Sequence, residues 1–175
     1  MTKTGYKFIE IGITVATNSY VTIIIGDSYG KEILLSHDMW NELIDRKQSV
    51  LSGLRTDEET CARTPIQIGN LLLRFGAINN LAVLRLDAQG TRVVISLSTV
   101  LVIFDLEHCI SRIASLLNAI IGNVNQKMKR FLEIASTVTE PAKIPKTIRE
   151  SDSYDRNDII DCELAALCFT PFASL

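Results

Sequence analysis

The feature that most constrains the fold of this chain is a pattern that occurs twice, sixty residues apart. In each copy, apolar residues alternate on both sides of a glycine-containing turn, which is typical of two strands joined in a hairpin. A further strand precedes each hairpin and a helix follows it. The stretches 21–36 and 81–96 align without a gap, and identical residues recur at matching positions: Asp27 and Asp87, Gly30 and Gly90, Ser36 and Ser96. The sequence therefore predicts two strand-strand-strand-helix repeats.

These expected elements divide the chain into four parts. They are a first repeat at 1–54, a linker at 55–65, a second repeat at 66–136, and a linker with a tail at 137–175. The helix of the second repeat is expected to be the longer one and to begin at an N-cap on Ser98. Pro141 and Pro145 are expected to end regular structure, because proline disrupts a helix interior. A short amphipathic helix is expected within 155–172, ending near Cys168.

The same pattern predicts the fold class and part of the core. The chain has 175 residues, 47% of them hydrophobic, which is enough to bury one core or two small fused halves. We predict an α+β protein in which antiparallel sheets carry helices on one face. Trp40 shares a helical stripe with Leu43 and Ile44, so we predict that it lies in the core.

Charge is distributed unevenly along the chain. The formal net charge is −2, but residues 150–175 contain six acidic side chains against Arg156 alone. A mildly basic body therefore carries an acidic tail. Three roles for the tail remain open: a competitor for the basic surface, a docking peptide for a partner protein through residues 155–175, or a helix packed permanently on the body.

The residues that carry chemistry favour a binding protein over an enzyme. His37-Asp38 and the group Asp105, Glu107 and His108 are the acid and base groupings, and helix capping or solvated helix faces explain both. The four cysteines form no Cys-x-x-Cys pair, so neither a metal nor another cofactor is expected. No apolar run is long enough for a membrane span, and the first residues lack the features of a secretory signal. An intracellular location, nuclear or cytoplasmic, is expected.

Polar residues on the outer side of the strands point to a ligand. If Ile23, Leu73 and Val83 face the helices, strand alternation places Ala82 and Leu84 on the opposite face. Aromatic, hydroxyl and basic side chains join them there or at the hairpin ends. Stacking surfaces beside cations are what single-stranded nucleic acid requires. The predicted binding residues are Tyr20, Thr22, Tyr29, Lys31, Arg74, Arg85 and Arg92.

One stretch carries a resemblance to a known family. The run Gly30-Lys-Glu-Ile-Leu-Leu-Ser-His-Asp-Met-Trp40-Asn-Glu-Leu-Ile44, with the strands before it, resembles the core of the transcriptional coactivator PC4 family. The similarity covers about residues 8–54 and, more weakly, 66–120. In that family and its Whirly-like relatives, two such units pair through their helices and present curved sheets to single-stranded DNA or RNA. The resemblance implies a PC4-like pseudo-dimer within one chain; the second copy lacks the tryptophan.

Two functions are compatible with these observations. The first is a non-enzymatic protein that binds single-stranded DNA or RNA with low sequence specificity, as an accessory to replication or transcription, for which the size suits a viral protein. The alternative is a structural or interaction protein that forms a homo-oligomer through its apolar helix and sheet face and binds no nucleic acid.

Overall fold

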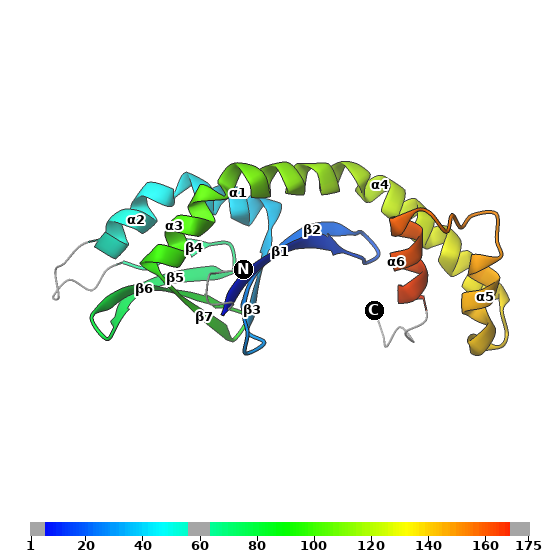
Figure 1. The fold of residues 1–175 in the computed structure, drawn as a ribbon, viewed down its shortest axis with the longest axis horizontal. Coiled ribbons are helices and arrows are strands. Elements are labelled where there is room, and N and C mark those ends of the chain that lie inside the picture. Colours follow the sequence, from blue (N-terminus) through cyan, green and yellow to red (C-terminus); the bar gives the residue numbers. More distant parts are fainter. Residues whose placement is uncertain (1–5, 56–63, 169–175) are drawn as a thin grey trace. The chain divides into compact units, whose positions relative to one another are not determined.

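The computed structural model describes residues 6–55 and 64–168, and it shows an α+β protein with two antiparallel sheets, as predicted (Figure 1). One sheet has the order β1-β2-β3 and the other β4-β5-β6-β7. The strands are β1 (Lys7–Thr14), β2 (Tyr20–Asp27), β3 (Glu32–Ser36), β4 (Ile66–Ile68), β5 (Leu71–Ile78), β6 (Leu81–Ala88) and β7 (Thr91–Ser96). The helices are α1 (His37–Asp45), α2 (Lys47–Arg55), α3 (Leu97–Asp105), α4 (Glu107–Thr137), the 3₁₀ turn η1 (Pro141–Lys143), α5 (Ile144–Arg149) and α6 (Ile159–Leu167). Most of the expected linker, Cys61 and the end of the tail lie outside the described residues.

The chain divides into two compact units, and the division does not follow the boundaries of the expected repeats. The first unit contains residues 1–12 and 21–117, and the second contains 13–20 and 118–175. The turn between β1 and β2 thus belongs to the second unit, together with the later part of α4 and everything after it.

Within the first unit, the helices begin at matching places. Both α1 and α3 have nine residues, and they start sixty residues apart. Ser36 caps α1, its Oγ accepting a hydrogen bond from the backbone N–H of Met39, and Ser96 caps α3 in the same way through Thr99. The N-cap predicted at Ser98 is therefore wrong. Ser96 is the last residue of β7 and has an extended backbone. An N-cap residue needs this conformation so that its side chain can accept a hydrogen bond from the first turn of the helix.

The two hairpins differ in the length of their turns. Asp87 pairs with Arg92, and the turn closes through Gln89 and Gly90, both with positive φ, as a tight hairpin requires. In the first hairpin Gly26 pairs with Glu32, so its turn is longer by one residue. Gly26 rather than Asp27 therefore occupies the place of Asp87.

This single residue reverses the predicted faces of β6. A shift of one residue moves every side chain of a strand to the other face. Leu84 is only 2% exposed and lies on the inner face with Ala82, whereas Val83 lies on the outer face. The predicted outward direction of Ala82 and Leu84 and inward direction of Val83 are wrong.

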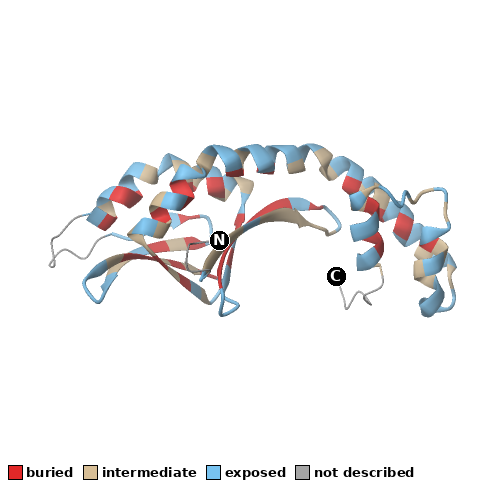
Figure 2. Cartoon of the chain, viewed as in Figure 1, coloured by how far each residue is buried: buried red, intermediate tan, exposed pale blue. Residues whose placement is uncertain are grey.

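The core of the first unit lies between the sheets and the helices, where Figure 2 shows most of the buried positions. Trp40 is fully buried, as predicted, and its Nε1 donates a hydrogen bond to Ser111 Oγ at 3.1 Å. Helix α2 contacts β5 and β6, and α3 contacts β6 and β7. A Cβ atom at Gly53 would lie 2.6 Å from the ring of Phe75, so the glycine is what lets α2 approach β5 closely.

The second unit has its own core, built on the later part of α4. Phe131 is fully buried there, packed with residues of α4, α5 and α6: Val124, Met128, Ile148, Leu164 and Ala165. Ile13 and Val15 of the β1–β2 region pack against the same cluster. In the structure the helix α6 packs on α4 and α5, which is the arrangement expected for the third of the three roles of the tail.

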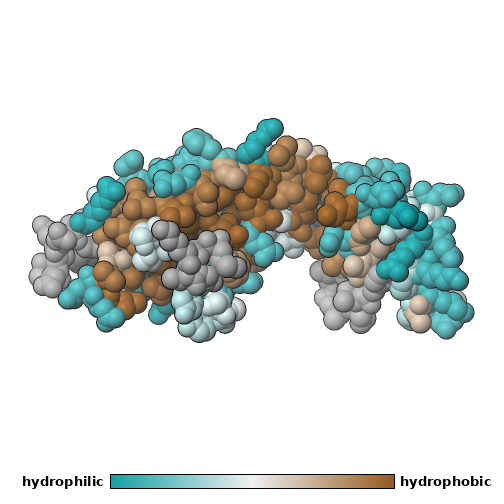
Figure 3. Space-filling view, in the orientation of Figure 1, coloured by the Kyte–Doolittle hydropathy of each residue, from teal (hydrophilic) through white to brown (hydrophobic). Residues whose placement is uncertain are grey.

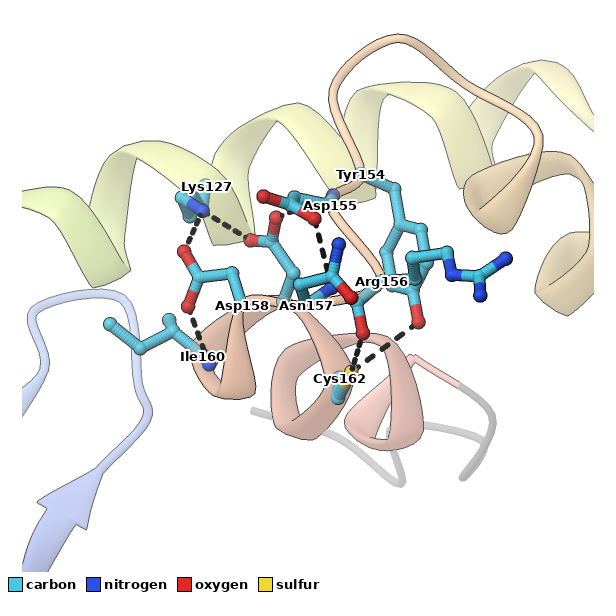
Figure 4. A network of polar contacts seen from close by, with 9 residues as sticks. Lys127, Tyr154, Asp155, Arg156, Asn157, Asp158, Ile160 and Cys162 are labelled. Atoms are coloured by element: carbon cyan, nitrogen blue, oxygen red, sulfur yellow. Dashed lines mark hydrogen bonds and ion pairs between the residues drawn. The ribbon is translucent and has the colours of Figure 1, made fainter.

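An ion-pair cluster holds the start of α6 on α4 (Figure 4). Lys127 Nζ contacts Asp158 at 2.7 Å and Asp161 at 2.6 Å. Asp158 also caps α6 through the backbone N–H of Ile160, and Asp161 accepts a hydrogen bond from the backbone N–H of Asp155. Burial lowers the pKa of Lys127, but the two carboxylates outweigh it and raise the pKa above its ordinary value.

Residues 141–149 are helical, within a segment that was predicted to be a linker. Pro141 begins η1 and Pro145 lies in the first turn of α5. Proline is well tolerated there, because the first N–H groups of a helix have no intrahelical acceptor. The prediction that these prolines end regular structure is therefore wrong. The short helix predicted before Cys168 is confirmed, since α6 ends with Cys168 as its C-cap.

Candidate nucleic-acid interface

The outer face of the second sheet gathers three of the predicted binding residues. Arg74 on β5 pairs directly with Arg85 on β6, and Asp87 pairs with Arg92 on β7. Directly paired residues point to the same side of a sheet, so all four side chains share one face. It is the face opposite to the buried leucines of β5 and β6. We call these four residues the arginine face.

Asp87 lies between two of the arginines and partly neutralises them. Its Oδ1 contacts Arg92 Nε at 2.5 Å, and its Oδ2 lies 3.4 Å from Arg74 Nε. The hydrogen bond and the charge of Asp87 raise the pKa of Arg92. Asp87 Oδ2 is shielded from solvent and accepts no hydrogen bond from the described residues, so Arg74 supplies an ion-pair contact only. The three groups together retain one positive charge, and the carboxylate holds both guanidinium groups in place.

Arg85 is the cation of this face that is free to bind a ligand. Among the residues that the structure describes, no acidic side chain pairs with it. Its guanidinium group lies across Gly76 on the neighbouring strand, 3.5 to 3.7 Å from the place where a Cβ atom would stand. Because Gly76 has no side chain, the planar guanidinium can lie along the surface of the sheet.

Asp87 and Gly76 were not among the residues predicted for this site. Arg85 and Asp87 are two apart on one strand, and this spacing alone places them on the same face. That signal was present in the sequence. The position of Gly76 under Arg85 depends on the pairing of β5 with β6, which the sequence does not specify.

Two other predicted residues lie on the β2–β3 hairpin and not on the strands that carry the arginines. Tyr29 is 79% exposed and Lys31 is also exposed. Asp27 fixes this turn, since its Oδ1 accepts hydrogen bonds from the backbone N–H groups of Tyr29 and Lys31, and its Oδ2 pairs with Lys7. Burial raises the pKa of Asp27, but Lys7 and the two backbone donors outweigh it, so that the pKa lies below its ordinary value.

The remaining two predicted residues do not join the arginine face. Thr22 is only 4% exposed, so its predicted position on the exposed face is wrong. It lies on β2, the middle strand of its sheet. Tyr20 is about half exposed, but it belongs to the second unit and is not part of the surface described here.

A second surface of the first unit is apolar. Four large side chains of α3 and the start of α4 are about half exposed: Val102, Leu106, Ile113 and Leu116. We call them the apolar stripe, and Figure 3 shows hydrophobic residues gathered over these helices. Beneath part of the stripe lies a cavity of about 210 Å³, bounded on its other side by β1. Nine of the twelve lining residues are aliphatic or aromatic.

The groupings considered for catalysis occupy ordinary structural positions. His37 is the first residue of α1, and Glu107, at the start of α4, pairs with Lys47 at 3.2 Å. In residues 6–55 and 64–168, no three His, Cys, Asp or Glu side chains are placed to hold a metal ion. None of the helices in these ranges is both long enough and apolar enough to cross a bilayer.

No protein-family model, curated protein or solved structure matches this chain.

Proposed function

We propose that this chain is a non-enzymatic protein that binds single-stranded DNA or RNA with low sequence specificity, in support of replication or transcription. The observation that carries the proposal is the arginine face, where three guanidinium groups on adjacent strands share one exposed surface. Guanidinium groups bind phosphate oxygens through paired hydrogen bonds. Arg85 offers the first contact, and Arg74 and Arg92 add contacts when a phosphate competes with Asp87.

The residues around the arginines explain why the proposed binding is unspecific. Phe75, the aromatic residue of β5, points to the opposite face and packs against Gly53, so it offers no stacking surface beside the arginines. The proposed contacts are therefore with the sugar-phosphate backbone, which carries no sequence information. Tyr29 at the exposed hairpin is the residue best placed to stack on a base. A PC4-like pseudo-dimer, with the two sheets as the two binding surfaces, is the arrangement that we propose for the repeats.

Replacing Arg85 by alanine is expected to weaken binding to all oligonucleotides by a similar factor. Affinity should also depend less on salt, with a slope of log K against log salt lower by about 0.7 for each lost phosphate contact. Fluorescence anisotropy with single- and double-stranded oligonucleotides at two salt concentrations measures both effects. Arg112→Ala is the matched control, because Arg112 is an exposed arginine of α4 in the same unit. Equal losses in the two variants would show that only net charge matters.

Replacing Asp87 by asparagine is expected to tighten binding, because the change removes the negative charge that Arg74 and Arg92 share. The salt dependence should become steeper, since both arginines become available to phosphates. Asp105→Asn changes the net charge equally on an exposed position of α3, and it serves as the control in the same titration. Weaker binding by Asp87→Asn would mean that Asp87 serves the site by holding the arginines in position.

A second candidate function, self-association without nucleic acid, is favoured by the apolar stripe. Exposed apolar patches often mark interaction surfaces. If the stripe joins two copies, sedimentation velocity should show a concentration-dependent dimer, and Leu116→Lys should abolish it. Leu81→Lys, at an exposed apolar position on β6, should leave the dimer intact. A monomer at all concentrations would rule this candidate out.

A further inference from the structure

The two sheets differ at one edge. The first half of the first unit begins with β1, followed by β2, β3, α1 and α2. The second half begins in the same way with β5, followed by β6, β7, α3 and the start of α4. β5 carries the short strand β4 on its outer edge, with Ile66 paired to Leu73 and Ile68 to Leu71. In the part of the chain that the structure describes, β1 is an edge strand with β2 as its only neighbour. An open edge presents unpaired backbone N–H and C=O groups that can pair with another strand.

Strand β4 fills the space between its sheet and the helices of the first half. Ile68 is completely buried, and α1 contacts β4. The side chain of Met39 on α1 lies against Gly69, directly after β4. At this edge, therefore, an extended segment with isoleucines two residues apart lies between α1 and β5.

The corresponding space at the edge of β1 is the cavity of about 210 Å³. Its walls are Ile9 and Ile11 of β1, with residues of α3 and α4 opposite. The sixty-residue spacing of the helix starts makes Thr99 of α3 the counterpart of Met39, and Thr99 lines the cavity. The cavity thus lies between β1 and α3, as β4 lies between β5 and α1 in the other half.

The two halves differ at one residue of the helix that faces this space. The counterpart of Gly53, which lets α2 contact Phe75, is Ile113 of α4, and Ile113 lines the cavity. The branched side chain of Ile113 therefore stands where, in the other half, a glycine lets α2 contact Phe75.

We propose that the groove formed by this cavity and the edge of β1 binds an extended segment of a partner protein, which adds to the edge of β1 as β4 adds to β5. The backbone of the segment would pair with β1, and aliphatic side chains two residues apart would enter the cavity. Strand addition of this kind derives affinity from main-chain hydrogen bonds and specificity from pockets for alternate side chains. The lining, with Lys7, Thr99 and Cys109 as its polar members, selects uncharged aliphatic residues. β4 itself, Ile66-Gln67-Ile68, shows the type of segment that fits.

The probe for this proposal is a synthetic peptide with the sequence of residues 64–70, added to the isotope-labelled full chain. Saturable changes are expected in the backbone amide NMR signals of β1, at Ile9 and Ile11. A control peptide with Ile66→Ser and Ile68→Ser should bind at least tenfold more weakly. The proposal is overturned if both peptides bind equally well, or if no signal changes saturably up to millimolar peptide. It is also overturned if the changes are confined to β5, which would mean that the peptide exchanges with β4.

A pair of variants locates the groove. Ile113→Trp fills the cavity and should weaken peptide binding at least tenfold, whereas Leu116→Trp, one turn further along α4 and outside the lining, should not. If Ile113→Trp lowers the melting temperature markedly, Val102→Trp at an exposed lining position replaces it. Sedimentation of the chain without peptide is the remaining measurement. If the chain forms a dimer that the peptide does not dissociate, and if this dimer prevents peptide binding, the groove is occupied by a second copy. That result would overturn the proposal.

Discussion

Replacing Trp40 by alanine is expected to destabilise the first unit by about 3–5 kcal/mol. The side chain is completely buried, so its loss leaves a large cavity among the helices. It also leaves Ser111 without the hydrogen bond from the indole N–H. Urea unfolding followed by far-ultraviolet circular dichroism measures the effect, since the variant has no tryptophan fluorescence.

Two further variants separate the contributions to the Trp40 effect. Ser111→Ala keeps the ring but leaves the buried indole N–H without an acceptor, and should cost about 1–3 kcal/mol. Trp40→Phe keeps much of the ring volume and should fall between Ser111→Ala and Trp40→Ala. A Trp40→Ala protein with unchanged stability but lost oligonucleotide binding would instead make Trp40 a stacking surface.

Replacing Lys127 by methionine is expected to destabilise the second unit by about 3–5 kcal/mol, because it leaves a buried carboxylate without its cation. Asp161 is only 1% exposed, and Lys127 is its cationic partner. Hydrogen exchange should show α6 opening more often than in the parent protein. Lys129→Met, at an exposed lysine of the same helix, should change stability by less than about 0.5 kcal/mol.

The double variant Lys127→Met with Asp161→Asn tests the physical cause of this loss. If the cost comes from an uncompensated charge, neutralising Asp161 should restore part of the stability. The same cluster predicts a pH dependence. Lys127 and the backbone N–H of Ile160 hold the pKa of Asp158 below its ordinary value. Its contribution is therefore present above that value and is lost as the pH falls through the lower, folded-state pKa. Stability of α6 that does not change on acidification would contradict this role.

The strands and most helices could be predicted because their signals are local. Alternation of apolar residues located β1, β2, β6 and β7, and the helical stripe placed Trp40 in the core. The directions of Val83 and Leu84 could not be predicted, because they depend on how many residues close each turn. Asp27 adds one residue to the first turn, through hydrogen bonds that hairpin alternation does not reveal.

Other differences arose from tertiary context. Thr22 has a residue type and a strand position that suit an exposed site, but it is buried on the middle strand of its sheet. Pro141 and Pro145 would end a helix if they lay in its interior, but they lie at the starts of η1 and α5, where proline is tolerated. For the arginine face, strand positions predicted the three cations. The ion pairs that tie two of them to Asp87 required the register between strands.

The second unit combines residues 13–20 with residues 118–175, so its two parts are synthesised at different times. The backbone N–H of Ser19, in the β1–β2 turn, donates a hydrogen bond to Asn125 Oδ1, a partner 106 residues further along the chain. At translation rates of about 5–20 residues per second, that partner follows roughly 5–20 s later. During this interval β1 and β2 can form their hairpin on the ribosome, but Ile13 and Val15 have nothing to pack against. The second unit therefore cannot be produced as one contiguous fragment, and its folding is expected to be completed only after α4 has been synthesised.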